Sequence, residues 1–275
     1  MKVASLGSGS RGNSVFVESD GTALLVDAGF SGAGLERRLD GLGIAPARIR
    51  GVVVTHEHRD HAEGIGVAAR RWGWPLFLTA GTASACASLL RGSEAVTVIE
   101  PERRFRLGEA IVHPVRTCHD AADPVAVVVE EPSTGLRTAV ATDLGRATTP
   151  VRSALSGCHF LVLEANHDEG RLRASPYPWS VKQRIGGSRG HLSNRLAAEL
   201  AAELAHPDLG GLLLAHLSEE CNETALARAV VEAGLRGTSF RGRLLVAEPA
   251  GPSEVHDVGG LVDRARGVRQ LSLLP

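Results

Sequence analysis

The sequence predicts an α/β fold in which sheets and helices form separate layers. Short runs of β-branched residues alternate along the chain with Ala-, Leu- and Arg-rich stretches that are typical of helices. Hydrophobic residues make up 43% of the 275 residues, which is enough for a large core. No repeat, low-complexity segment or linker divides the chain. We therefore expect one domain over residues 1–248 and a loosely held tail over residues 249–275.

The first half of the chain predicts strands that alternate with helices. The turns between its opening strands contain the stretches "GSGSRGN" and "SDG", which are rich in turn-forming residues. Gly43 closes the first helix, because glycine is favoured just after a helix end. The predicted strands cover residues 2–8, 14–19, 22–29, 49–56 and 75–80. The predicted helices cover residues 31–43, 62–73 and 81–92.

The second half begins with four more apolar runs, and all four predict strands. They cover residues 110–119, 125–132, 137–145 and 159–168. A basic interval rich in Pro and Gly follows. The amphipathic stretch "LSNRLAAELAAELAH" then predicts a helix, and "LGGLLLAHLS" predicts a last buried strand.

Composition excludes several classes of protein. The formal net charge is −1, so any site for a polyanion has to be a local patch. The start "MKVASLGSGSRGNS" has no long apolar segment, and no run approaches the ~18 apolar residues of a membrane span. Four cysteines without a CxxC pair argue against a zinc ribbon or a disulfide framework. We expect a cytoplasmic protein that does not bind membranes.

Potential metal ligands follow several of the predicted strands. Polar groups at equivalent ends of neighbouring strands converge at one edge of a layered fold. Taken one at a time, such residues are usually plain polar loop residues, and we interpret His113, His159, His206 and His256 in that way. As a set, the ligands at the strand ends predict a metal site. They are His56, His119, Asp143, His167 with Asp168, and His216.

The stretch "GVVVTHEHRDHAEG" (residues 51–64) carries the densest group of ligands. His56 and His58 are two residues apart and share one face of extended chain. Asp60 and His61 fall where the next helix should begin. Two pairs in different directions suit two metal ions better than one. A solvated charged turn is the alternative, but burying so many unpaired polar groups would be costly. Imidazole and carboxylate donors without thiolate favour catalytic Zn²⁺, Mn²⁺ or Fe.

The segment "THEHRDH" resembles the HxHxDH motif of metallo-β-lactamase-fold hydrolases. Asp27, His119, Asp143 and His216 match the later motifs of that family, and the match extends to about residue 248. The resemblance implies an αββα four-layer sandwich with a two-metal site at one edge. It implies that Asp143 bridges the two ions and that Asp27 orients the ligand loop. The first implied ion takes His56, His58 and His119, and the second takes Asp60, His61 and His216.

Within that superfamily the chain is most similar to the YycJ (WalJ) group. The segments that carry this similarity are "SLGSGSRGNS", "CHDAADP", "ATDLG", "LEANHD", "SPYPWSVKQRIGGSRGHLSN" and "LAHLSEECN". Cys118 stands where the group has Ser. The layout also resembles tRNA-processing ribonuclease Z, which implies proton transfer by His191 with Glu164. His167 is the alternative proton donor. The interval from Asp143 to His216 is too short for the insert domain of the β-CASP nucleases.

Residues 170–198 bear most directly on the substrate. This segment has six Arg or Lys residues and no acid, together with Tyr177 and Trp179. Cations interleaved with aromatic rings suit phosphates and unpaired bases. The alternative is a solvated basic loop whose rings pack on the sandwich. The residues expected to contact substrate are Arg173, Tyr177, Lys182, Arg184, Arg189 and Asn194.

The sequence therefore predicts a metal-dependent phosphodiesterase that acts on nucleic acid. We expect two divalent ions to activate a bridging hydroxide for attack on phosphorus. Asp60 should be essential for both metal loading and activity. DNA is preferred over RNA as the substrate, and exonuclease action is one form that this prediction allows. The alternatives are a hydrolase of small esters, thioesters or lactones, and a metal-binding protein without catalysis.

Overall fold

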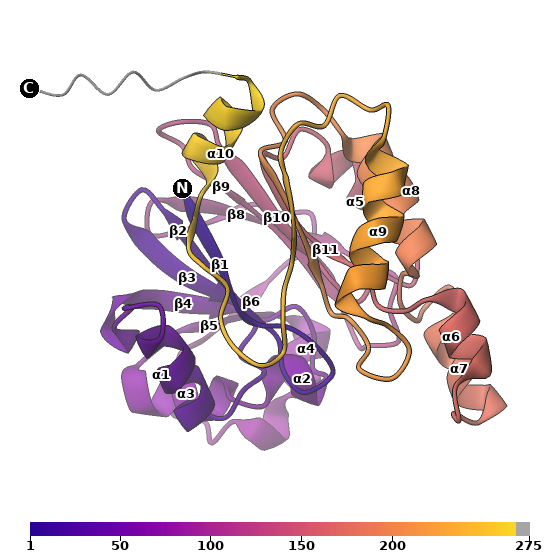
Figure 1. Cartoon of the computed structure of the whole chain (residues 1–275). Coiled ribbons are helices and arrows are strands. Elements are labelled where there is room, and N and C mark those ends of the chain that lie inside the picture. Colours follow the sequence, from indigo (N-terminus) through magenta and orange to yellow (C-terminus); the bar gives the residue numbers. More distant parts are fainter. Residues whose placement is uncertain (268–275) are drawn as a thin grey trace, which may run out of the picture.

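Two mixed seven-stranded sheets form the centre of the computed structural model, which describes residues 1–267 (Figure 1). The first sheet has the order β14-β1-β2-β3-β4-β5-β6, and the second has the order β13-β12-β11-β10-β9-β8-β7. The strands of the first sheet are β1 (Lys2–Gly7), β2 (Ser14–Ser19), β3 (Thr22–Val26), β4 (Ile49–Val53), β5 (Leu76–Thr79), β6 (Val96–Ile99) and β14 (His256–Asp257). Those of the second are β7 (Phe105–Leu107), β8 (Ala110–Arg116), β9 (Val125–Glu130), β10 (Arg137–Ala141), β11 (Phe160–Glu164), β12 (Gly211–Ala215) and β13 (Arg243–Val246).

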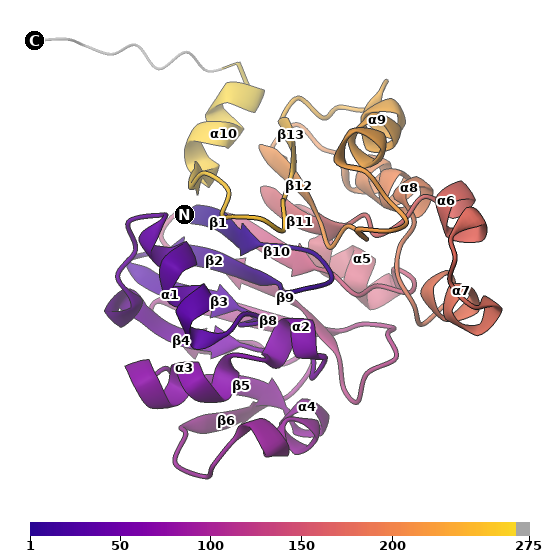
Figure 2. The ribbon, with the colours of Figure 1, turned by 60° about the horizontal axis from the view of Figure 1, so that its bottom comes forward.

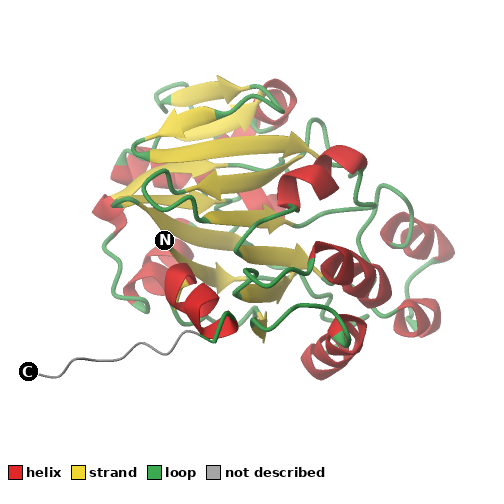
Figure 3. Cartoon of the chain, turned by 90° about the horizontal axis from the view of Figure 1, so that it is seen from above, coloured by secondary structure: helices red, strands yellow, loops and turns green. Residues whose placement is uncertain are grey.

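Helices cover the outer faces of both sheets, and Figure 3 shows the strands in the middle with helices around them. On the side of the first sheet the helices are α1 (Gly32–Asp40), α2 (Arg59–Ala62), α3 (Ile65–Trp72) and α4 (Ala80–Ala85), with short 3₁₀ turns at Pro46–Arg48 and Ala87–Leu89. On the side of the second they are α5 (Thr149–Leu155), α6 (Glu169–Ala174), α7 (Trp179–Ile185), α8 (Asn194–Leu204) and α9 (Thr224–Leu235). The last described helix is α10 (Val258–Ala265).

Successive side chains of each strand point to opposite faces of its sheet, which explains why the buried apolar side chains form three layers. In β3, Leu24 and Val26 face the second sheet, whereas Ala23 and Leu25 face helices α1 and α3. In β12, Leu213 faces the first sheet and Leu214 faces α8 and α9. Both faces of each sheet are therefore buried, which is why these strands have continuous apolar sequences rather than alternating ones. The predicted αββα four-layer sandwich is confirmed.

Parallel pairing brings the carboxyl ends of the central strands together. In the first sheet β3 pairs in parallel with β4, and in the second β10, β11 and β12 pair in parallel. The residues that follow these strands consequently emerge at one edge of the sandwich. Within residues 1–267, no helix has the length and apolar character that a membrane crossing needs.

Several elements differ from the sequence prediction. β13 and α9 follow β12 and were not predicted, although β12 is the last described strand whose residues are all buried. The stretch 81–92, predicted as one helix, forms only the end of the short α4 and a 3₁₀ turn, and Thr79 caps α4 by accepting a hydrogen bond from the backbone N–H of Thr82. The basic interval also contains two short helices, α6 and α7. The first begins where Asp168 caps it by accepting a hydrogen bond from the Arg171 backbone N–H.

The segment after residue 249 is not a loosely held tail as far as the structure describes it. β14 pairs antiparallel with β1, and α10 packs Val258, Leu261 and Val262 into the core between the sheets. The sequence does not predict α10, because its apolar pattern "VGGLV" is short and follows a Pro- and Gly-rich stretch. Residues 268–275 of the predicted tail lie outside the described residues.

Truncation of Leu261 tests whether α10 belongs to the core. Leu261 is 2% exposed, so Leu261→Ala should lower the free energy of unfolding by about 2–5 kcal/mol. Arg264→Ala on the same helix is the matched control and should change it by less than about 0.5 kcal/mol. Urea denaturation measures both, and equal stabilities of the two variants would contradict this packing.

Candidate metal centre

Donor side chains from both sheets converge at the edge where the parallel strands end. They form overlapping groups whose ligand atoms lie within 4.8 Å of one another. One group follows β4 and β8, a second combines α2 with the end of β12, and the others include Asp143 after β10. The groups are His56, His58 and His119; Asp60, His61 and His216; His56, His61 and Asp143; and Asp143, Glu164, His191 and His216.

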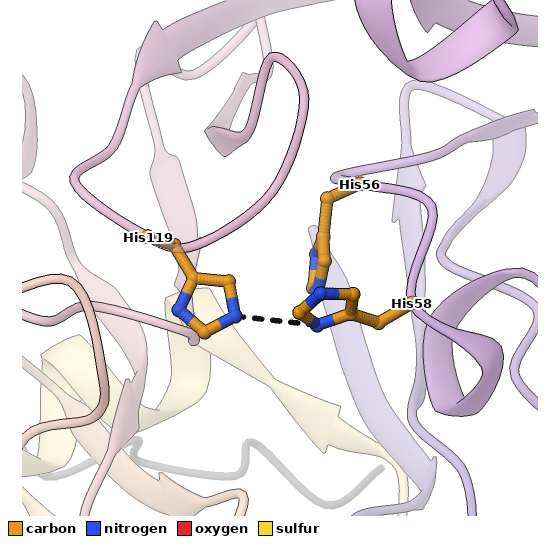
Figure 4. A group of neighbouring side chains, drawn as sticks. All are labelled: His56, His58 and His119. Carbon is orange, nitrogen blue, oxygen red and sulfur yellow. Dashed lines mark hydrogen bonds between the residues drawn. The ribbon is translucent and has the colours of Figure 1, made fainter. Parts of the chain in front are cut away.

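The first group consists of the three histidines in Figure 4. His119 Nε2 lies 3.3 Å from His58 Nδ1, and His56 approaches from the side of β4. His119 Nδ1 lies 2.9 Å from the carbonyl oxygen of Gly190, to which it can only donate. That bond leaves Nε2 free as a ligand atom. His56 Nε2 is buried and has no hydrogen-bond partner among the described residues.

The second group is built around Asp60. Its Oδ2 lies 3.2 Å from His216 Nε2 and 3.4 Å from His61 Nε2. His61 Nδ1 is 2.7 Å from Oδ2 of Asp27, which fixes the ring and leaves Nε2 for a metal. Asp27 also accepts a 2.7 Å hydrogen bond from the backbone N–H of Thr55, so it ties the ligand loop to the end of β4.

Asp143 lies between the two groups. Its Oδ1 is 3.5 Å from His119 Nε2 of the first group, and its Oδ2 is 3.1 Å from His61 Nε2 of the second. The carboxylate is 2% exposed, which is uncommon for an acid unless it is paired or binds a cation. Its two oxygens are therefore placed to serve both groups at once.

Backbone strain is concentrated at this centre. Asp27, Asp143 and His216 have φ of 65°, 57° and 56°, in the left-handed region that non-glycine residues seldom adopt. Each of them comes directly or almost directly after a buried strand, β3, β10 or β12. Strained residues persist where surrounding structure holds them, and they gather at functional sites. The left-handed turn aims each side chain back across the edge of the sheets.

Electrostatics provide an independent test of whether a cation fits here. Burial by itself would lower the pKa of His216, but carboxylates, Asp143 first among them, outweigh burial and raise it to about 10. Asp143 and Asp27 raise the pKa of His61 in the same way against the effect of burial. The cluster thus has an excess of buried negative charge, which a proton or a metal ion must balance. The donor set and the unpartnered His56 Nε2 fit divalent metal binding.

Glu164 organises the side of the second sheet. Its Oε1 accepts hydrogen bonds from His191 Nδ1 at 2.7 Å and from His216 Nδ1 at 3.1 Å. Its Oε2 accepts from the backbone N–H groups of Leu144 and Leu192. Ionisation of Glu164 is favoured, because although burial would raise its pKa, His191 and the hydrogen bonds lower it to about 2.

Comparison with known proteins agrees with this geometry. Residues 22–216 match the sequence profile of the β-lactamase superfamily domain. The chain belongs to the β-lactamase superfamily. The relative "Exodeoxyribonuclease YycJ" of Bacillus anthracis is 33% identical over 86% of this chain and 89% of its own. "Exodeoxyribonuclease WalJ" of Streptococcus pneumoniae is 32% identical over 82% of this chain and 85% of its own. Our assignment to the YycJ/WalJ group is confirmed.

A solved structure supports the fold. The metallo-β-lactamase fold protein YhfI of Bacillus subtilis superposes with a TM-score of 0.70 at 19% identity, covering 92% of this chain and 98% of its own. Family membership and the donor set together make this β-lactamase-superfamily chain a metal-dependent hydrolase.

The residues expected to contact the substrate lie in three different places around the metal centre. Tyr177 and Arg184 line a cleft of about 220 Å³ together with His58, Asp60 and His191. Arg189 donates to the carbonyl oxygen of His119 and so supports the ligand loop. Arg173 and Lys182 do not line the cleft, and Lys182 Nζ donates to the carbonyl oxygen of Arg173.

Two other expectations differ from what the structure contains. Asn194 is buried at the start of α8, and its amide is paired on both sides with the amide of Asn222. It is 2% exposed and does not line the cleft, and it joins α8 to the loop before α9. His167, the alternative proton donor, is 2% exposed and does not line the cleft.

Sequence reasoning missed several supports of the centre. Asn13 Nδ2 lies 3.2 Å from Asp60 Oδ2, and its backbone N–H donates to the carbonyl oxygen of Asp60 at 2.7 Å. Ser8 donates to Asn13 Oδ1 and accepts from the backbone N–H of His216. Asp120 bonds to Arg184. "GSGSRGNS" and "CHDAADP" were recognised as signatures of the group, but their spacing alone does not tell which polar residue turns inward.

Asn13→Ala should weaken divalent metal binding by about 10- to 100-fold, because Asp60 loses the partner that orients it. Competition between the metal-free protein and a chromogenic chelator for Zn²⁺ measures the affinity. Asn194→Ala is the matched control, since it removes a buried amide that contacts none of the proposed ligands. Equal losses in the two variants would show that Asn13 acts only on stability.

Stability of the metal-free protein should fall as the pH rises from about 6.5. The folded pKa of His216 is raised to about 10, so its protonated form adds stability that is fully present below its ordinary pKa and is lost as the pH rises. Melting temperatures between pH 6.5 and 8.5, below thiol ionisation, test this. Bound metal ions replace the proton, so the metal-loaded protein should change less, and an opposite order would contradict the charge balance.

Proposed function

We propose that this protein is a nuclease that hydrolyses phosphodiester bonds in DNA with the help of two divalent ions. The observation that carries the proposal is the cleft in which Tyr177 and Arg184 meet His58, Asp60, His191 and His216. A cation and an aromatic ring beside a metal centre suit a phosphate and a base. Relatives that are named exodeoxyribonucleases over most of the chain support the same substrate class.

The donors would divide between two ions, with Zn²⁺ or Mn²⁺ preferred and Fe also compatible. His56, His58 and His119 would hold one ion, and Asp60, His61 and His216 the other, with Asp143 between them. When bound, such ions supply Lewis acidity that activates water and neutralises charge on the phosphate. Asp27 would keep His61 in the tautomer that binds metal.

Side chains of the second sheet would bind the substrate and complete the reaction. Arg184 would donate hydrogen bonds from its guanidinium to a phosphate oxygen, and Asp120 holds that guanidinium beside the cleft. Burial would lower the pKa of His191, but Glu164 outweighs this effect and raises it, which favours the protonated ring. As water bonds to phosphorus and the ester P–O bond breaks, His191 would give its proton to the departing oxygen, and the water would lose its proton to solvent.

Hydrolysis of end-labelled single- and double-stranded DNA and RNA, with Mn²⁺ or Zn²⁺ supplied, tests the proposal. The wild type should cleave DNA. Asp60→Ala, purified identically, should lose both metal and activity, which excludes a contaminating nuclease. The product ladder distinguishes exonuclease from endonuclease action. A metal-loaded wild type that leaves every nucleic acid intact but hydrolyses a thioester or lactone would overturn the proposal.

His191→Ala separates proton donation from metal binding. It should lower kcat by about 10²- to 10⁴-fold while the protein keeps its metal content. Steady-state kinetics and elemental analysis of the same preparation measure both quantities. His113→Ala, which removes a histidine on β8 outside the cleft, is the matched control. If His191→Ala loses metal instead, His191 is a ligand and another group supplies the proton.

A further inference from the structure

Helices α6 and α7 form an arm, residues 169–189, that projects from the sandwich in both Figure 1 and Figure 2. α7 contains no buried residue, so it is not held by a core of its own. Its most prominent side chain is Trp179, which is 70% exposed. Trp72 and Trp74, by contrast, stack on each other with ring centroids 4.6 Å apart. The expectation that the rings of this segment pack on the sandwich therefore does not hold for Trp179.

The arm is fixed to the metal centre despite its exposure. Arg184 bonds to Asp120, next to the ligand His119. The backbone N–H of His191 donates to the carbonyl oxygen of Ile185 at the end of α7. Tyr177 lies in the cleft, and Trp179 follows two residues later, at most roughly 7 Å along the chain. Stacked nucleotides are about 3.4 Å apart along one strand, so the Trp179 ring is within reach of a nucleotide next to the one in the cleft.

Charge on the arm is one-sided. After Glu169, its residues up to 189 contain five Arg or Lys side chains and no acid. Arg171 pairs with Glu223 and Arg184 with Asp120. Within residues 1–267, Arg173, Lys182 and Arg189 take part in no ion pair. This side of the centre therefore has positive charge available for phosphates.

The charge of a recess next to the cleft is balanced. A second recess shares Ser10 and Asp60 with the cleft and is also lined by Arg11, Arg59 and Glu63. Arg11 pairs with Glu219 at 2.6 Å, and Arg59 pairs with Glu63 at 3.2 Å. These cations are thus neutralised within the protein. A long polyanion gains little electrostatic attraction in this recess, whereas a short strand end with one or two phosphates can be accommodated.

From this asymmetry we propose that the arm holds the long part of an unpaired DNA strand, with Trp179 as a stacking platform for a base outside the cleft. The balanced recess beside Ser10 receives only the short end that is released. This inference rests on the proposed nuclease function and deepens it, because it names the substrate as single-stranded and assigns its direction across the centre.

Trp179→Ala tests the stacking platform. For the ten-nucleotide strand dT10, it should raise KM by roughly 5- to 100-fold more than for bis(p-nitrophenyl) phosphate. Trp179→Phe should recover most of this difference, because a ring face is retained. Val98→Ala removes another exposed apolar side chain, on β6, and should leave both substrates unchanged. An equal effect of Trp179→Ala on dT10 and on the small diester would overturn the platform.

Binding of DNA without catalysis provides a second test of the stacking platform. In EDTA, dT10 should quench the tryptophan fluorescence of the wild type, and this quenching should be lost in Trp179→Ala, since the other two tryptophans stack on each other. Arg173→Ala should lower the slope of log affinity against log salt by about 0.7, as expected for one lost phosphate contact. Arg59→Ala, which removes another exposed arginine that is already paired with Glu63, should change it less.

The outcomes separate this inference from the nuclease proposal. If the wild type cleaves DNA but Trp179→Ala binds and cleaves dT10 like the wild type, the arm inference fails and the nuclease proposal stands. If dT10 binds through Trp179 but no nucleic acid is cleaved, the arm inference stands and the nuclease proposal fails. Equal salt slopes for Arg173→Ala and Arg59→Ala would overturn the assigned direction.

Discussion

The carboxylate of Asp27 connects the first sheet to the metal centre. It accepts hydrogen bonds from the Thr55 backbone, the Thr55 hydroxyl and His61 Nδ1, so one side chain joins the ends of β3 and β4 to the ligand loop. Its backbone is left-handed, with φ of 65°, a strained conformation that the surrounding structure holds. Close packing maintains the geometry, because a Cβ on Gly29 would lie 1.7 Å from the carbonyl oxygen of Asp60.

Glu164 has the corresponding role in the second sheet. It is fully buried at the end of β11, and its four hydrogen bonds join the loops after β10 and before α8 to His191 and His216. The two carboxylates thus hold donors that come from different sheets. Such a centre needs both sheets packed face to face, since the group of His56, His58 and His119 and the group of Asp60, His61 and His216 each combine donors from the two sheets. Stability of the sandwich and assembly of the site therefore depend on the same core.

The role that we propose for the arm would extend this arrangement from metal binding to substrate selection. The superfamily scaffold is used for several chemistries, so the fold does not decide the substrate. In this chain an exposed ring and unpaired cations lie on the arm, whereas the cations of the neighbouring recess are neutralised by ion pairs. Electrostatic asymmetry of this kind gives a strand one preferred direction of approach.

The sequence by itself determined the layered fold and the principal donors, because both depend on local pattern. Apolar runs of strand length predict buried strands, and the crowding of His56, His58, Asp60 and His61 behind one of them is too costly without a metal. It also identified Tyr177 and Arg184, which line the cleft. The sequence did not predict α10, because the burial of Leu261 depends on a sheet that is distant in the sequence and not on a long periodic segment.

Only the tertiary structure decided which polar side chains turn inward. Asn13 bonds to Asp60 across a sequence separation of 47 residues, and the buried amide of Asn194 bonds to Asn222, 28 residues away. Neither contact leaves a trace in local spacing. The exposure of Trp179 was also undecided, because the same "PYPW" could pack on the sandwich or project from it. Long-range packing settles such alternatives, since it alone determines which surface is covered.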